Sequence, residues 1–185
     1  PDAVSRFNRE ASNASRLSHP NICQIYDFGE TTDGIIYLAM EFIEGCSLSD
    51  LIEREGALPP ARAASILRQS ADALQVAHDQ TIVHRDIKPD NIMIVTAKDG
   101  SDVAKVVDFG IAKALAGDEM GQKVTKTGLV VGTPEYMSPE QLSGDKLDGR
   151  SDIYSLGLVL YKMLTGVLPF QADTAQETMI KRLTD

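Results

Sequence analysis

Three short motifs follow one another along the chain, and they constrain its fold and chemistry more than any other feature of the sequence. Residues 84–91 read HRDIKPDN, residues 108–110 read DFG, and residues 132–140 read GTPEYMSPE. Asp86 can accept the proton of an attacking hydroxyl, and Lys88 can neutralise charge on a transferring phosphoryl group. Asn91 and Asp108 carry the kind of oxygen atom that magnesium prefers as a ligand. Together, the motifs predict a site for phosphoryl transfer.

Each motif has a simpler interpretation when it is taken alone. A polar turn between two strands would explain Asp86, Lys88 and Pro89, and an aspartate before a glycine turn often ends a strand. Neither interpretation explains why all three motifs occur in this order. We therefore favour the functional interpretation of the set.

The ordered set resembles three parts of the protein kinase family: the catalytic loop, the magnesium loop and the end of the activation segment. The lysine two residues after Asp86 is the serine/threonine kinase pattern, and residues 139–141 and 150–157 are most similar to bacterial kinases of this type. The resemblance implies an α+β, protein kinase-like fold. Its expected parts are a partial small N-terminal β lobe at residues 1–42, a hinge at 43–47 and an incomplete, mostly helical C-terminal lobe at 48–185.

The resemblance assigns catalytic and metal-binding roles within the motifs. Asp86 is expected to be the catalytic base. Lys88 and Asn91 complete the catalytic loop, and Thr133 steadies Asp86 and Lys88. Asn91 and Asp108 are expected to hold the Mg²⁺ that accompanies ATP.

The resemblance also implies control by phosphorylation. In the family, an arginine before the catalytic aspartate, here Arg85, marks kinases that are activated through their activation loop. Between Gly110 and Gly132 the only hydroxyl residues are Thr125 and Thr127. We expect phosphate on one or both threonines, with Arg85 as its receptor.

A further set of residues resembles the ATP-binding site. Met40 corresponds to the gatekeeper, the backbone of Glu41 and Ile43 would bond adenine, Ser47 would lie near the ribose, and Met93 would form the pocket floor. Core packing is the alternative for Met40 and Met93. Glu10 resembles the glutamate that pairs with the phosphate-binding lysine, although a solvated surface charge is the commoner role of a helical glutamate.

The family pattern is incomplete in this chain. No Gly-rich loop and no Val-Ala-x-Lys pattern precede Glu10, so we expect a fragment of a longer kinase, truncated at both ends and inactive by itself. The alternative is a pseudokinase that binds partners without catalysis. Aminoglycoside phosphotransferases share an aspartate–asparagine loop but lack Lys88 and the Thr133–Glu140 pattern.

Composition limits the expected partners and location. The 185 residues carry a formal net charge of −9, which argues against a general nucleic-acid binder. Cys23 and Cys46 make neither a disulfide framework nor a zinc pattern. No apolar run approaches the ~20 residues of a membrane helix. We therefore expect a cytoplasmic domain. The resemblance to kinases implies its partners: ATP, proteins with serine or threonine, and a second copy of itself during autophosphorylation.

Periodicity predicts the elements. Helices are expected at residues 4–17, from Ser47 through 55, at 60–80, at 151–165 and after 173; strands are expected at 22–28, 35–42, 92–95 and 104–107. The apolar helix 151–165 is expected to be buried on most sides. Asp152, at its start, resembles a buried aspartate that holds the catalytic-loop backbone, and a helix cap is an equal alternative.

Overall fold

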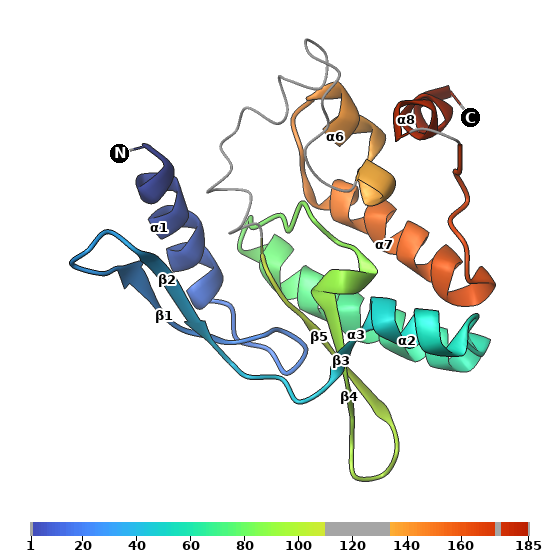
Figure 1. Ribbon diagram of the computed structural model, residues 1–185, viewed down its shortest axis with the longest axis horizontal. Coiled ribbons are helices and arrows are strands. Elements are labelled where there is room, and N and C mark those ends of the chain that lie inside the picture. The colour runs from blue at the N-terminus through green and yellow to red at the C-terminus, as the bar shows by residue number, and fades with distance from the viewer. Residues whose placement is uncertain (1, 110–133, 173–174, 185) are drawn as a thin grey trace.

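The computed structural model describes residues 2–109, 134–172 and 175–184. It confirms an α+β fold in which a helix and a small sheet lie to one side and a second small sheet and the remaining helices lie to the other (Figure 1). The extended segment 41–44 joins the two parts. No helix among the described residues is both long enough and apolar enough to cross a membrane.

The N-terminal part consists of α1 (Asp2–Ser15) and an antiparallel pair, β1 (Ile25–Glu30) and β2 (Ile36–Met40). Phe7, Ala11 and Ala14 recur at helical spacing on α1 and are buried. The ring of Phe7 meets the ring of Phe28 edge to face, with centroids 6.5 Å apart. These contacts hold α1 against β1.

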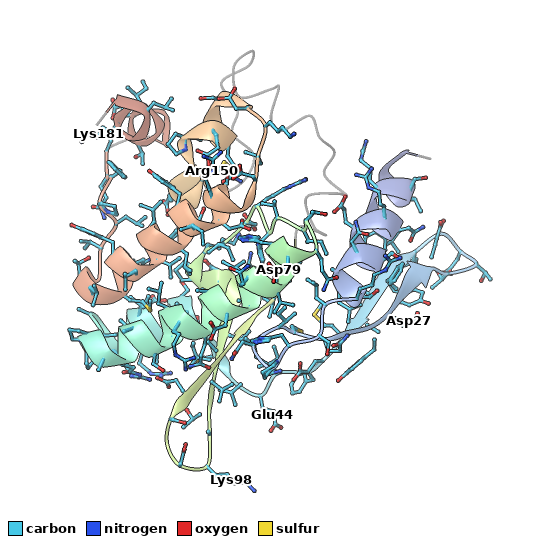
Figure 2. All side chains as sticks on the ribbon, turned by 180° about the vertical axis from the view of Figure 1, so that it is seen from behind. Asp27, Glu44, Asp79, Lys98, Arg150 and Lys181 are labelled. Atoms are coloured by element: carbon cyan, nitrogen blue, oxygen red, sulfur yellow. The ribbon has the colours of Figure 1, made fainter. Side chains whose placement is uncertain are left out.

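The second sheet has the order β3 (Cys46–Ser47), β4 (Ile92–Thr96), β5 (Asp102–Val106), and its strands are antiparallel. Met93 on the central strand pairs with Ser47 on one side and with Lys105 on the other. Figure 2 places Lys98 at the tip of the β4–β5 hairpin, away from the helices.

Five described helices complete the structure: α2 (Leu48–Glu55), α3 (Pro60–Asp79), α6 (Pro139–Ser143), α7 (Gly149–Thr165) and α8 (Ala175–Thr184). Ser47 caps α2 through a reciprocal bond with Asp50, as its position in the sequence predicts. The buried side of α3 packs on β5 and α7. Asp79, labelled in Figure 2, is the last residue of α3, and the chain runs from there to the loop at residues 84–91.

Three expectations need correction. The segment 22–24 does not extend β1, because Cys23 and its neighbours bond the backbone of Val106 on β5 instead. Helix α7 begins at Gly149, and its cap is Asp148 rather than Asp152. The expectation that α7 is buried on most sides was also wrong, because one face of the helix is open. On that face Ile153 is 54% exposed among the described residues. The strand β3 and the helix α6 were not predicted, because each is very short.

The two parts are also joined by a buried polar link between the segment that follows α1 and the second sheet. The Nδ2 of Asn21 donates to the Ala104 carbonyl at 2.7 Å and to the Gln69 Oε1 at 3.0 Å. That same Gln69 oxygen accepts the Ala104 N–H at 3.0 Å. Because buried polar groups are costly when unpaired, this network fixes the segment after α1 against β5 and α3.

Candidate active site

The catalytic-loop residues converge on the carboxylate of Asp86. Asn91 donates through Nδ2 to Asp86 Oδ2 at 3.0 Å and to the Asp86 carbonyl at 2.8 Å. The Nζ of Lys88 lies 3.3 Å from the same Oδ2. A 3₁₀ turn over Pro89–Asn91 brings Asn91 back toward Asp86. The structure therefore brings Asp86, Lys88 and Asn91 together, as the spacing of the motif predicts.

The ring of His84 is fully buried and supports this loop through two hydrogen bonds. Its Nε2 bonds the Val107 carbonyl at 2.9 Å, and its Nδ1 accepts the Asp86 N–H at 3.2 Å. These partners define a neutral imidazole with the proton on Nε2. Burial lowers the pKa of His84 and outweighs the opposing effect of the nearby carboxylates of Asp152, Asp86 and Asp108.

Asp152 holds the backbone just before Asp86. Its Oδ2 accepts the His84 N–H at 2.8 Å and bonds His78 Nε2 at 2.7 Å, and its Oδ1 accepts the Arg85 N–H at 2.8 Å. The side chain is 1% exposed. This geometry decides between the two interpretations of Asp152: it anchors the catalytic loop, and Asp148 caps the helix.

Asp108 lies two residues after the end of β5, next in sequence to a backbone contact with Asn91. The N–H of Val107 donates to the Asn91 carbonyl at 3.0 Å, which places Asp108 one residue from this contact. Asp108 has φ +61°, and the buried ring of Phe109 packs on His84 with centroids 4.7 Å apart. A positive φ is uncommon for a residue with a side chain. Tertiary contacts on both sides therefore maintain an unusual backbone at the predicted metal ligand.

Glu41, two residues before the expected hinge, forms an ion pair that the sequence did not predict. The Glu41 carboxylate lies 2.8 Å from Lys105 Nζ on β5. This lysine lowers the pKa of Glu41. The Glu41 N–H donates to the Gln24 carbonyl at 2.8 Å, and its carbonyl accepts a weak bond from Cys23 Sγ at 3.7 Å. The Glu41 N–H is therefore already used by Gln24, whereas the carbonyl, with one weak bond from Cys23, can still accept a further bond.

Other expected nucleotide contacts flank this hinge. Ser47 and Met93 are paired across β3 and β4, so the structure brings them together. Met40 is 43% exposed at the end of β2, and Ile43 is half-buried. These positions are compatible with an adenine site along the segment 41–47.

Glu10 lies apart from the catalytic loop on α1. Its Oε1 pairs with Nη2 of the adjacent Arg9 at 2.9 Å, and the two side chains are 24% and 68% exposed. A pair this exposed contributes little to stability. Its expected role toward phosphate remains a hypothesis. Thr125, Thr127 and Thr133 lie outside the described residues.

Sequence reasoning missed the supporting roles of His78, Lys105, His84 and Gln141. The His84 side chain accepts the Asp86 N–H, and Gln141 Nε2 donates to the Arg85 carbonyl at 2.8 Å. For Gln141 there was a partial signal, because Ser138-x-x-Gln141 has the spacing of a capping box. His78 and Lys105 act through contacts with residues distant in the chain, which no local pattern indicates.

Comparison with known proteins identifies what the site is similar to. The profile of the protein kinase domain matches residues 2–185. Serine/threonine-protein kinase pkn3 of Myxococcus xanthus is 46% identical over 98% of this chain, which covers 33% of that protein. PknB of Mycobacterium tuberculosis and PrkC of Bacillus subtilis, also serine/threonine-protein kinases, are each 46% identical over 94% and 97% of the chain. The chain spans about a third or less of these relatives' length.

Proposed function

The chain belongs to the protein kinase family, and on that premise we propose that the protein containing it transfers the γ-phosphoryl group of ATP to serine or threonine hydroxyls of proteins. The observation that carries the proposal is the Asp86 carboxylate, held at Oδ2 by Asn91 and Lys88. An acceptor held this firmly can orient a hydroxyl and take its proton as the oxygen attacks phosphorus.

Each neighbour of Asp86 has a distinct task in this reaction. The substrate oxygen forms a bond to the γ-phosphorus while the bond to ADP breaks, and the hydroxyl proton goes to Asp86. Lys88, whose Nζ lies 3.3 Å from Asp86, would stabilise charge on the phosphoryl oxygens. Asn91 Nδ2 donates one bond to the Asp86 carboxylate and one to the Asp86 backbone carbonyl, so the carboxylate is held relative to its own backbone.

Asn91 and Asp108 fit the expected magnesium ion. The Asn91 amide nitrogen is committed to Asp86, which turns Oδ1 to the other side as a neutral oxygen donor. Asp108 adds a carboxylate one residue after Val107, whose N–H bonds the Asn91 carbonyl, and oxygen ligands of these two kinds suit magnesium. When bound, the ion neutralises charge on the phosphates of ATP.

The proposal is tested by transfer of labelled phosphate from ATP to a generic protein substrate, using the protein with whatever sequence adjoins these residues. Asp86→Asn should lower kcat by about 100-fold or more, because it removes the proton acceptor. Asp90→Asn is the matched control, since Asp90 is an exposed carboxylate on the same loop. Binding of ATP without any transfer by the wild type would instead favour a pseudokinase.

We also propose that residues 1–185 alone transfer phosphate far more slowly than the longer protein. Glu10 pairs with Arg9 in the described part of the chain, and no Val-Ala-x-Lys pattern precedes it in the sequence. The phosphates of ATP therefore lack one of the positioned charges on which this reaction depends. Equal kcat values for the two proteins would contradict this proposal.

Regulation by the activation segment is a third part of the proposal. Phosphate on Thr125 or Thr127, added by a second copy of the kinase, would bring close to two negative charges near Arg85. Mass spectrometry of the active protein should find phosphate on one or both threonines. The double variant Thr125→Ala/Thr127→Ala should lose activity, and full activity in that variant would exclude this mode of control.

A further inference from the structure

Gln141, in the first turn of α6, uses both ends of its side-chain amide. Its Oε1 accepts the Ser138 N–H at 3.0 Å, which is one half of the capping box of this helix. Its Nε2 donates to the Arg85 carbonyl at 2.8 Å. The side chain therefore links the helix after the third motif to the catalytic loop, 56 residues away in the chain.

The peptide group that Gln141 contacts is the one that leads into Asp86. The Arg85 carbonyl and the Asp86 N–H belong to the same planar unit. Gln141 binds the oxygen of this unit, and His84 Nδ1 accepts its N–H at 3.2 Å. The two contacts hold opposite ends of one plane, so they determine its rotation and with it the direction in which the Asp86 side chain leaves the backbone.

The backbone at this point needs such support. Arg85 has φ +66°, a region that residues with a side chain seldom adopt. Its N–H is already bound by Asp152 from α7 at 2.8 Å. Gln141 adds a contact from α6 on the other side of the same residue. Without Gln141, the Arg85 carbonyl would lose its hydrogen bond from α6.

We propose that Gln141 is a positioning residue for Asp86: its Nε2 holds the Arg85 carbonyl and so helps to fix the direction of the catalytic carboxylate. The inference rests on the proposed kinase function. A glutamate at this position would satisfy the capping box equally well but offers no N–H to the Arg85 carbonyl. The second contact is therefore the role that requires glutamine.

The test compares two variants that separate the two roles. Gln141→Glu keeps the capping acceptor and removes the donor, so kcat should fall about 10-fold while KM for ATP stays within twofold, since the hinge is untouched. Ser138→Ala removes the hydroxyl that accepts the Gln141 N–H at 3.3 Å and leaves the amide contact in place. It should weaken α6 with little change in kcat.

Amide exchange supplies a readout that does not depend on activity. In residues 1–185, the Asp86 amide should exchange faster in Gln141→Glu than in the wild type or in Ser138→Ala, with melting temperatures reported for all three. A wild type that transfers no phosphate defeats the proposed function but leaves this comparison valid. A wild-type kcat and unchanged Asp86 exchange in Gln141→Glu, or equal losses in Ser138→Ala, would overturn the positioning role.

Discussion

At the scale of single residues, the catalytic loop depends on side chains that face inward and never meet a substrate. Asp152 accepts two consecutive backbone N–H groups, those of His84 and Arg85. Buried acceptors of this kind cost more to remove than exposed ones, because the donors left behind lose their partners in a place that water cannot reach. The conformation of the catalytic loop therefore depends on α7, the helix that carries Asp152.

Asp152→Ala should therefore destabilise the chain by about 3 kcal/mol or more, since two backbone donors and His78 lose a charged partner. Asp148→Ala, which removes an exposed N-cap and an exposed ion pair with Arg150, should cost about 1 kcal/mol. Urea denaturation of both variants measures the difference. Similar losses in the two would mean that Asp152 acts as little more than a second cap.

Stability should also fall on acidification through His84. Burial holds its folded-state pKa below the unfolded value of about 6.5, so below that pH the unfolded chain binds a proton that the folded chain does not. The free energy of unfolding contributed by this residue is complete above pH ~7 and declines as the pH falls through ~6.5 toward the folded-state pKa.

The His84→Phe variant isolates this effect. It keeps an aromatic ring beside Phe109 but cannot titrate, so its urea midpoint should change less between pH 7 and pH 5.5 than that of the wild type. It should also be less stable at pH 7, by about 1–3 kcal/mol, because the Val107 carbonyl and the Asp86 N–H lose their partner. An equal pH dependence in both proteins would assign the acid sensitivity to other groups.

At the scale of elements, the short strand β3 aligns the hinge with the floor of the expected nucleotide site. Gly45 lies directly before it and passes so close to β4 that a Cβ would collide with the Ile94 carbonyl. Ser47 then pairs with Met93 and caps α2 in the same turn of chain. A sequence pattern indicates the cap, but a two-residue strand has no periodicity from which it could be predicted.

Two glycine substitutions should have opposite effects on these elements. Gly45→Ala should destabilise the chain and weaken ATP binding, because the backbone of Ile94 cannot move aside without breaking the β3–β4 pairing. Gly157→Ala, in the middle of α7 with no described atom near the new methyl group, should stabilise the chain by up to about 1 kcal/mol. Thermal melts and ATP titrations of both variants provide the measurement, and destabilisation by Gly157→Ala would show that this face of α7 is covered.

At the scale of the whole molecule, the two sheets differ in how they are supported. The β1–β2 pair has α1 on one side and leaves Tyr26, Ile35 and Phe42 more than half exposed. The β3–β4–β5 sheet lies on α3, with Ile92, Ala104 and Val106 fully buried. A two-stranded sheet with so little cover is marginal in water.

Hydrogen exchange of residues 1–185 should reflect this difference. The amides of β1 and β2 should exchange at least tenfold faster than those of β5 and α3, because local opening of the small sheet exposes little buried surface. The buried Asn21 link should protect residues 21–23 more than the β1–β2 pair, although they adjoin it in the chain. Uniform protection across both sheets in a monomeric sample would contradict this prediction.

The sequence by itself determined the chemistry of the site and the local ends of several elements. Asp86, Lys88 and Asn91 lie within six residues, so a tight loop brings them together whatever surrounds it, and the Ser47 cap depends on Asp50 three residues away. Hydroxyl, amide and carboxylate groups at such short spacing leave few alternative arrangements.

Only the tertiary structure decided which distant residues hold that loop in place. Asp152 reaches Arg85 across 67 residues, Lys105 reaches Glu41 across 64, and Gln141 reaches Arg85 across 56. From its own segment alone, each of these polar side chains could equally well be exposed to solvent. It becomes a specific partner only when packing brings a backbone group or an opposite charge within hydrogen-bond distance, and no local pattern encodes that distance.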